Sequence, residues 1–117
     1  MIESFKAVIA PSILSCDFAN LQSECEKILK LGANWLHIDI MDGYFLLPPA
    51  YSHFVPNLTL GFPIIHALKK KMPKAFFDCH CMISDPMRWV KDLAASGANL
   101  MTFHYESTIS IEHVIYQ

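Results

Sequence analysis

Two apolar stretches of the chain each contain ionisable side chains at alternating positions. Successive side chains of a β-strand point to opposite faces, so residues two positions apart project from the same face. Each stretch therefore places three side chains of mixed chemistry on one face of a strand. The two sets are His37, Asp39 and Met41 in residues 35–41 and Asp78, His80 and Met82 in residues 75–83.

Two imidazoles and a carboxylate are a suitable ligand set for a divalent metal ion. His37, Asp39 and His80 offer donor atoms that zinc, iron and manganese accept, and three protein ligands leave coordination positions open for a substrate. A carboxylate inside an apolar strand is costly unless it is paired, which favours a functional role for Asp39. The HxD spacing alone is weak, because a histidine in an apolar strand is more often a hydrogen-bonded core residue.

Other polar residues nearby have structural explanations. We expect Asp42 and Asp78 to cap backbone groups or to join a buried hydrogen-bond network. His104 shares a strand face with Thr102, and it has either a pocket contact or a structural role. The remaining histidines are expected at the surface: His53, His66 and His113.

The four cysteines do not suggest a disulfide framework. Cys79 and Cys81 are too close for an ordinary bridge, and Cys16 and Cys25 have no obvious pairing pattern. We interpret all four as reduced thiols, most of them buried. Because Cys79 and Cys81 point away from the face of His80, a Cys and His metal cluster is disfavoured here.

Apolar periodicity and helix-boundary residues predict the elements that position these side chains. Strands are predicted at residues 7–14, 35–41, 75–83 and 100–104. Helices are predicted from an N-cap at Asp17 to Gly32, over residues 63–71, from an N-cap at Asp85 to Gly97, and from Ser110 onward. A long loop is predicted at residues 42–60.

The alternation of strands and helices with short connections is typical of parallel strands covered by helices, which indicates the α/β class. Two of the predicted helices end in a similar phrase, LGAN at residues 31–34 and SGAN at residues 96–99. The similarity indicates one helix-to-strand turn used twice in a repeating unit.

Composition sets bounds on the fold and its partners. The 117 residues are 53% hydrophobic and 17% charged, which favours one folded domain over residues 1–117. A formal net charge of -2 provides no basic field for nucleic acid or an anionic membrane. Residues 43–68 lack Asp, Glu, Lys and Arg, but prolines within them exclude a transmembrane helix. No signal-peptide pattern is present, so the expected compartment is the cytoplasm.

Five segments of the chain carry a family resemblance: APSIL at residues 10–14, LHIDIMDG at 36–43, FVPN at 54–57, FDCHCM at 77–82 and TFHYE at 102–106. Together they resemble the ribulose-phosphate 3-epimerase family. The segments occur in the family's order over nearly the whole chain, so the match is specific.

The resemblance implies the N-terminal half of a (β/α)8 TIM barrel, with about four parallel strands and covering helices. It implies that His37, Asp39 and His80 bind one divalent metal ion, which is zinc, iron, manganese or cobalt. Asp39 is the implied catalytic residue. The implied substrate-binding residues are Ser12, His37, Met41, His80 and Met82.

The family reaction belongs to the pentose phosphate pathway and interconverts D-ribulose 5-phosphate and D-xylulose 5-phosphate by inverting carbon 3 through an enediolate. One acid/base group removes a proton, a second returns one to the opposite face, and the metal stabilises the developing charge. Asp39 resembles the first group. The family's second aspartate lies in a DGG motif that these 117 residues do not contain.

Two departures from the family pattern bear on function. Because a typical barrel has about 250 residues, we interpret the chain as a truncated form. We expect little activity from it alone, because the family's second aspartate and its phosphate-binding loops are absent from these residues. The alternative is a non-catalytic half-barrel that associates with itself or with a full-length epimerase subunit. Residues 46–54 (LLPPAYSHF) are interpreted as an insertion, either a lid or the product of an altered splice junction.

An open sheet of four strands also exposes its edges and its inward face. Valine, isoleucine, leucine and phenylalanine are frequent in the predicted strands, so this face is expected to be apolar. We therefore predict a dimer or an aggregate rather than a stable monomer.

Overall fold

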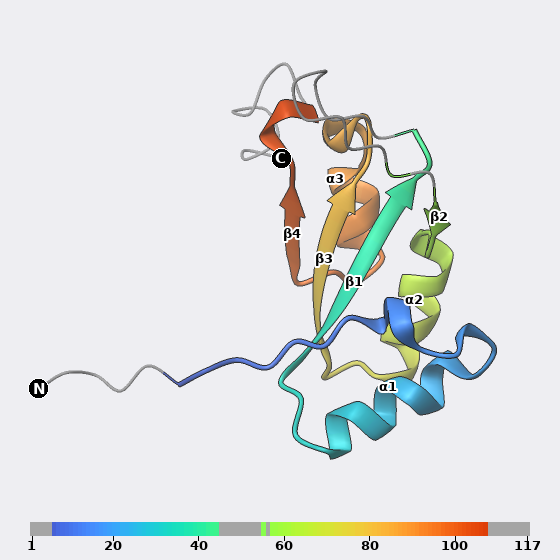
Figure 1. The fold of residues 1–117 in the computed structure, drawn as a ribbon, viewed down its shortest axis with the longest axis vertical. Helices are drawn as coiled ribbons and strands as arrows, with labels where there is room; N and C mark the ends of the chain where they lie inside the picture. The colour runs from blue at the N-terminus through green and yellow to red at the C-terminus, as the bar shows by residue number, and fades with distance from the viewer. Residues whose placement is uncertain (1–5, 45–54, 56, 108–117) are drawn as a thin grey trace, which may run out of the picture.

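A computed structural model describes residues 6–44, 55 and 57–107. These residues form an α/β fold around a four-stranded sheet of order β2-β1-β3-β4 (Figure 1). The strands β1 (Trp35–Asp42), β3 (Phe76–Met82) and β4 (Leu100–Phe103) are parallel, and the short β2 (Leu58–Thr59) runs antiparallel to β1. The predicted α/β class with mostly parallel strands is confirmed.

Three α-helices accompany the sheet: α1 (Leu21–Lys30), α2 (Phe62–Lys71) and α3 (Pro86–Ala95). In Figure 1, α2 and α3 lie behind the sheet, and α1 lies near the end at which β1 begins. Three short 3-10 turns complete the described elements: η1 (Ile13–Ser15), η2 (Phe18–Asn20) and η3 (Tyr105–Ser107). The helices α2 and α3 thus lie on one side of the sheet, and the opposite face is toward the viewer.

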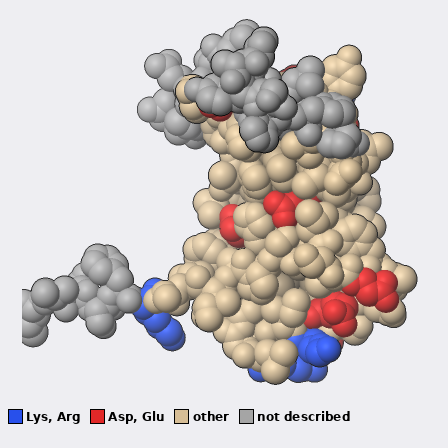
Figure 2. Space-filling view, viewed as in Figure 1, with Lys and Arg blue, Asp and Glu red and all other residues tan. Residues whose placement is uncertain are grey.

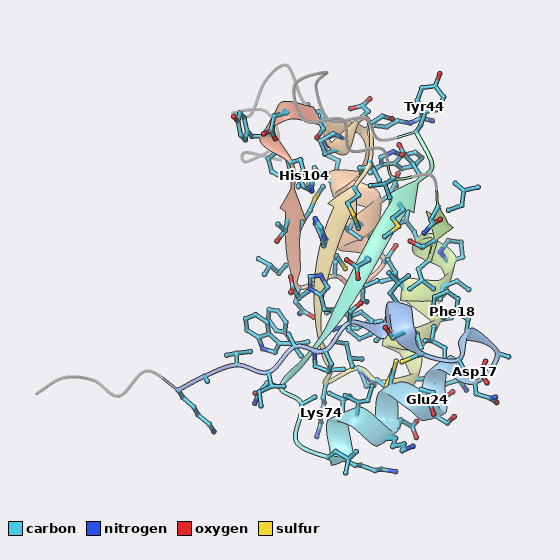
Figure 3. The ribbon with its side chains drawn as sticks, viewed as in Figure 1. Asp17, Phe18, Glu24, Tyr44, Lys74 and His104 are labelled. Carbon is cyan, nitrogen blue, oxygen red and sulfur yellow. The ribbon has the colours of Figure 1, made fainter. Side chains whose placement is uncertain are left out.

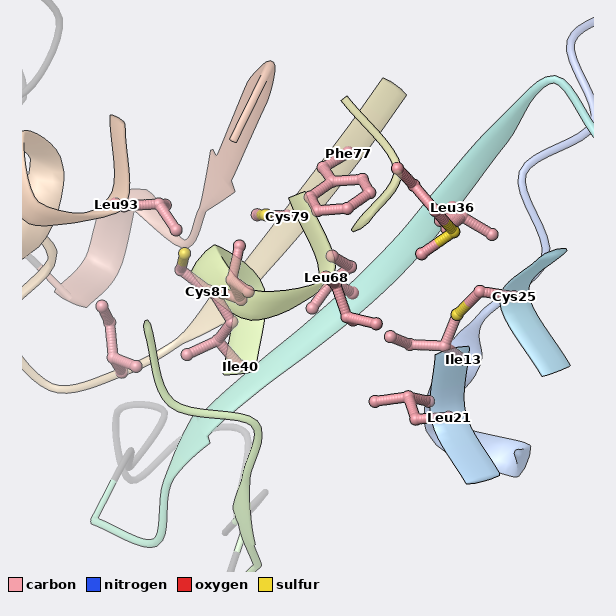
Figure 4. Packing of buried hydrophobic residues seen from close by; sticks show 14 residues of the cluster. Ile13, Leu21, Cys25, Leu36, Ile40, Leu68, Phe77, Cys79, Cys81 and Leu93 are labelled. Carbon is pink, nitrogen blue, oxygen red and sulfur yellow. The ribbon is translucent and has the colours of Figure 1, made fainter. Parts of the chain in front are cut away.

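The hydrophobic core lies between the sheet and the helices (Figure 4). Alternate residues of the two central strands point into it, and apolar residues of α2 and α3 meet them. The core includes Leu36, Ile38 and Ile40 from β1, Phe77, Cys79 and Cys81 from β3, Ile65 and Leu68 from α2, and Leu93 from α3. The remaining residues of β1 and β3 are left for the other face of the sheet.

Helix boundaries follow the predicted residues at two of the three α-helices. The Asp85 carboxylate accepts a hydrogen bond from the Arg88 N–H, and Pro86 begins α3, where its missing N–H is not needed. The first turn of α2 contains a proline, whose missing N–H is not needed there, and three lysines in the last turn suit the helix dipole. Asp17 instead caps η2 through the Ala19 N–H, and α1 begins only after that turn.

The two GAN phrases form the same helix-to-strand turn, as the sequence indicated. The glycines have φ angles of 109° at Gly32 and 100° at Gly97, a region that favours glycine. In each turn the following asparagine pairs twice with a residue of the preceding extended segment, through its own N–H and through its side-chain oxygen. Asn34 pairs in this way with Ile9, and Asn99 pairs with Phe77.

The strand predicted at residues 7–14 is much shorter than expected. This segment lies extended beside β1, but it pairs through a single isolated bridge between Ser12 and His37. Backbone N–H groups at the start of β1 also donate to the carbonyls of Ile9 and Pro11. Pro11 has no N–H to donate, and the chain turns into η1 directly after Ser12, so the pairing ends there.

The loop predicted at residues 42–60 is also shorter than expected. β1 continues to Asp42, and Leu58 and Thr59 form a strand that pairs with Met41 and Asp42. The insertion at residues 46–54, the helix from Ser110, His53 and His113 lie outside the described residues. Within the described ranges, no helix has both the length and the apolar character needed to cross a membrane.

Candidate metal centre

The register between β1 and β3 brings the two predicted sets of side chains together. Because the strands are parallel and adjacent, residues at paired positions lie side by side on the face that the helices leave open. The paired positions are His37 with Asp78, Asp39 with His80, and Met41 with Met82.

Asp39 lies at the centre of this group and is only 9% exposed. Its Oδ2 atom accepts a hydrogen bond of 2.6 Å from the Ser12 hydroxyl. Its Oδ1 atom lies 3.3 Å from Nε2 of His37 and 3.2 Å from Nδ1 of His80. One carboxylate oxygen is therefore held by a hydroxyl, and the other faces two imidazole nitrogens.

The geometry fits a divalent metal ion. One ligand atom from each of His37, Asp39 and His80 lies within 4.8 Å of the other two. An ion among them would be within reach of two nitrogens and one oxygen, a donor set typical of zinc, iron, manganese and cobalt. In the part of the chain that the structure describes, these three residues form the group of His, Cys, Asp and Glu side chains close enough to share an ion.

The surroundings of Asp39 favour its ionised form. Burial by itself raises the pKa of Asp39, because it disfavours the charged carboxylate. The hydrogen bonds from Ser12 and His80 and the charges of His37 and His80 outweigh burial and lower the pKa below its usual range. Asp39 is therefore a carboxylate at neutral pH, the form that binds a cation or accepts a proton.

Each of the two histidines has a second partner on its other ring nitrogen. Nδ1 of His37 lies 2.7 Å from Oδ2 of Asp78, and Nε2 of His80 lies 3.0 Å from Nε2 of His104. Figure 3 labels His104, which directly follows β4. Burial and the charge of His80 lower the pKa of His104, and Glu106 partly offsets this effect. Both imidazoles are thus held between two groups.

Ser12 reaches Asp39 because of the turn that follows it. Ser12 is the N-cap of η1, and its hydroxyl oxygen accepts a hydrogen bond from the Leu14 N–H. The backbone bridge to His37 fixes Ser12 beside β1. The Ser12 hydroxyl therefore has a defined direction toward the carboxylate. The contact with substrate expected for Ser12 stays a prediction.

The charge on this side of the molecule also suits a cation. Figure 2 shows acidic side chains near the centre of the face toward the viewer. Lys and Arg are visible only near the lower end and on the N-terminal arm. A cation approaching the centre of this face would meet carboxylates and no neighbouring basic side chain.

Comparison with known proteins decides the family. The sequence model described as "Ribulose-phosphate 3 epimerase family" matches residues 8–117. The chain belongs to the ribulose-phosphate 3-epimerase family. The predicted resemblance is therefore confirmed for nearly the full length of the sequence given.

Several named ribulose-phosphate 3-epimerases are similar to this chain. The Eremothecium gossypii protein is 49% identical over 88% of the chain and 44% of its own length. The Candida glabrata protein is 48% identical over the same shares of both. A rice protein named as a cytoplasmic isoform is 50% identical over 91% of the chain and 42% of its own length. The chain spans less than half the length of these relatives.

The two methionines of the epimerase motifs lie on the open face together with the candidate ligands. Met41 and Met82 are paired across β1 and β3, one step beyond Asp39 and His80 toward the carboxyl ends of the strands. Both are partly exposed. Thioether side chains at this position could line a pocket, so the substrate contact expected for them stays a prediction.

Asp42 of the MDG motif has the structural role that the sequence suggested. Its Oδ2 atom accepts hydrogen bonds from the backbone N–H and the hydroxyl of Ser84, and its Oδ1 atom accepts one from the Tyr44 N–H. The carboxylate thus connects the end of β1 to the segment between β3 and α3. It faces away from the metal centre.

The cysteines are free thiols, as predicted. Cys79 and Cys81 lie in the core on the helix side of β3, and burial raises the pKa of each to about 12. Burial also raises the pKa of Cys25 to about 11. These three thiols are therefore neutral near pH 7, and none belongs to the candidate metal centre.

Thr59 also contacts the backbone beside Asp39, and no feature of the sequence predicted this role. Its hydroxyl donates to the Asp39 carbonyl at 2.6 Å and accepts from the Met41 N–H at 3.1 Å. These bonds hold the backbone of β1 next to the candidate ligand. A two-residue strand has no periodicity, so no pattern could have indicated Thr59.

Proposed function

We propose that this chain contributes the metal-binding part of a ribulose-phosphate 3-epimerase site. In this proposal His37, Asp39 and His80 hold one divalent ion, and the substrates are D-ribulose 5-phosphate and D-xylulose 5-phosphate. The observation that carries the proposal is the convergence of the three ligand atoms within 4.8 Å in a chain of this family.

The proposed chemistry follows from the residue types. When bound, a divalent ion supplies positive charge for the carbonyl and hydroxyl oxygens of the substrate. Asp39 is ionised and nearly buried, so its carboxylate is the group that takes the proton from carbon 3. Ser12 orients this carboxylate through Oδ2 and leaves Oδ1 toward the histidines.

The remaining family residues receive binding roles. Met41 and Met82 form an apolar border beside the reacting carbons, and they exclude water from the carboxylate. The ligand imidazoles of His37 and His80 also contact the substrate oxygens. Phosphorylated pentuloses are therefore the proposed small-molecule partners, and the cytoplasmic isoform among the relatives supports a cytoplasmic location.

An assay of the purified 117-residue chain tests this function. The chain is incubated with each of zinc, iron(II), manganese and cobalt, and epimerisation is followed by a coupled assay with Asp39→Asn as the inactive control. We expect metal-dependent turnover far below that of full-length relatives, because Asp39 provides one of the two acid/base groups that the reaction needs. Turnover that persists in Asp39→Asn or without metal would contradict the proposed role of Asp39.

A second candidate function is association. β4 is an edge strand of the described sheet, and Leu100 on this strand is 42% exposed. A parallel edge of this kind can pair with another chain, either a second copy or a full-length epimerase subunit. Co-purification with a full-length epimerase, with a change in its turnover, would favour this function over independent catalysis.

A further inference from the structure

The two candidate ligand histidines use different ring nitrogens toward Asp39. His37 directs Nε2 to Oδ1 of Asp39 at 3.3 Å, whereas His80 directs Nδ1 to the same oxygen at 3.2 Å. The opposite nitrogen of each ring has its own partner at hydrogen-bond distance. The nitrogen that faces Asp39 is therefore the one not occupied by the partner of each ring, which is Asp78 for His37 and His104 for His80.

Asp78 determines the choice at His37. A carboxylate can only accept a hydrogen bond, so the contact of 2.7 Å between Asp78 Oδ2 and His37 Nδ1 places a proton on Nδ1. The side chain of Asp78 is only 14% exposed, which makes this hydrogen bond strong and costly to break. In the neutral ring, the Nε2 lone pair then faces the Asp39 carboxylate, and two such groups need a cation between them.

His104 has the corresponding position at His80, with one difference. A neutral imidazole nitrogen either donates or accepts, so the contact of 3.0 Å between the two Nε2 atoms allows the proton on either ring. Without metal, Nδ1 of His80 donates to Asp39 and His104 donates to Nε2 of His80. If Nδ1 of His80 held an ion, His80 would carry its proton on Nε2 and donate to His104, whose own proton would then lie on Nδ1. The number of protons is the same in both arrangements.

We propose that Asp78 and His104 are positioning residues of the metal centre, which select Nε2 of His37 and Nδ1 of His80 as the ligand atoms. This proposal rests on the metal site proposed above and adds which nitrogens bind and what selects them. Partners of this kind on the far nitrogen fix the ring orientation and the tautomer of ligand histidines. Asp78 provides a fixed acceptor, and His104 provides a partner that can reverse its role.

Histidine NMR of the 15N-labelled chain tests the tautomers directly. Spectra are recorded at about pH 8, first without metal and then during titration with zinc. We expect His37 to carry its proton on Nδ1 throughout, and His80 to change from Nδ1–H to Nε2–H as zinc binds. A neutral His37 ring protonated on Nε2 in the metal-free chain, or a His80 ring that keeps Nδ1–H with zinc bound, would overturn the proposal.

Zinc affinity of four variants gives a second measurement. Asp78→Asn and His104→Phe are expected to bind zinc about 10–100-fold more weakly than the unmodified chain, the usual effect of losing a partner of a metal ligand. His104→Gln keeps a group that donates or accepts, so we expect it to restore most of the affinity lost in His104→Phe. Asp92→Asn, on the exposed side of α3, removes the same charge away from the site and is expected to bind as the unmodified chain does.

The outcomes separate this proposal from the proposed function. Equal zinc affinity of Asp78→Asn and Asp92→Asn would overturn the role of Asp78, whatever the assay of epimerisation shows. If the unmodified chain binds no zinc, the metal site itself is refuted, and with it the ligand selection that depends on it. Weakened zinc binding in His104→Phe with rescue in His104→Gln supports a positioning role, because a purely structural side chain would not require a hydrogen-bonding replacement.

Discussion

Asp39 combines features that rarely occur together at one residue. It is nearly buried, it lies in the middle of an apolar strand, and its carboxylate is nevertheless ionised. The hydroxyl of Ser12 and the imidazoles on either side offset the desolvation cost. The Ser12 hydrogen bond fixes the position of this carboxylate before an ion arrives, so the side chain is preorganised for a cation.

Replacing Asp39 by asparagine should therefore abolish strong metal binding. The amide of Asp39→Asn keeps the shape but lacks the negative charge. We expect zinc affinity to fall by more than about 10-fold, the lower limit for losing a hydrogen-bond partner of a metal ligand. Isothermal titration calorimetry measures this, with Asp92→Asn as the charge-matched control. Unchanged binding in Asp39→Asn would count against Asp39 as a ligand.

The thiols provide a second prediction at the residue scale. With pKa values raised by burial to about 12 for Cys79 and Cys81 and about 11 for Cys25, fewer than about one thiol in a thousand is ionised at pH 8. Cys16 is only partly buried. Reaction with a thiol-specific chromogenic disulfide should therefore label one cysteine rapidly and the other three only after unfolding.

The variant Cys16→Ser identifies the reactive thiol. It should show no rapid phase, and the three slow thiols should remain. A rapid phase that survives in Cys16→Ser would show that one of the core thiols is accessible, contrary to the packing described.

Sequence reasoning predicted that the three candidate ligands lie together, but it did not predict all of their partners. The convergence of His37, Asp39 and His80 followed from two regular features, the period-two alternation of strands and the pairing of parallel neighbours. The contacts of Thr59 and His104 depend on a two-residue strand and on the register of β4. No local pattern encodes such a register, so these contacts became evident only from the structure.

At the level of elements, the two GAN turns offer a matched experiment. Gly32 and Gly97 have similar positive φ angles, but their surroundings differ. A Cβ atom at position 32 would have no heavy atom within 4 Å, whereas one at position 97 would overlap the Cγ atom of Lys69. Lys69 in turn donates to the Ala75 carbonyl at 2.7 Å and to the Asn99 side chain at 2.8 Å.

Alanine substitution should therefore cost more at position 97. We expect Gly32→Ala to lower the free energy of unfolding by about 1–2 kcal/mol through backbone strain alone. Gly97→Ala should lower the free energy of unfolding by roughly 1–3 kcal/mol more, because Lys69 must move and its hydrogen bonds to Ala75 and Asn99 break. Urea unfolding of the two variants measures the difference. Equal costs would show that Lys69 adapts without loss.

The elements themselves were largely predictable, with errors at places of weak periodicity. α3 begins at its predicted cap because the Asp85 carboxylate accepts from a first-turn N–H and Pro86 needs no N–H partner at the first helical position. Residues 7–14 are apolar enough for a strand. They form only one bridge because Pro11 lacks an N–H and the chain turns after Ser12. Apolar content alone indicated a strand there, whereas hydrogen-bonding capacity limited it.

At the level of the whole molecule, the open face of the sheet is less apolar than the strand composition suggested. The isoleucines and leucine of β1 and the buried phenylalanine of β3 lie on the helix side. The open face carries the histidines, the carboxylates and the paired methionines, and also the aromatic pair Trp35 and Phe76 at the start of the strands. The open face is therefore apolar at one end and polar in the middle, because Leu100 and the stacked rings of Trp35 and Phe76 share it with the ionisable side chains.

The edge at β4 still favours association. We expect size-exclusion chromatography with light scattering to give a mass above 13.3 kDa for the chain. Leu100→Lys places a charge on the edge strand and should reduce the associated fraction. Leu31→Lys, at a 79% exposed position after α1, is the matched control and should leave association unchanged. A monodisperse monomer with cooperative unfolding would contradict this expectation.

The shared turn also has a geometric consequence beyond its own residues. Asn34 and Asn99 directly precede β1 and β4, and each pairs with one residue of the neighbouring extended segment, which sets the stagger between the two segments. In a closed barrel the staggers add up around the ring to the shear, which together with the strand number fixes the strand tilt and the diameter. Lengthening either turn by one residue would therefore change the tilt of the strands that follow, and with it the width of the opening over the metal centre.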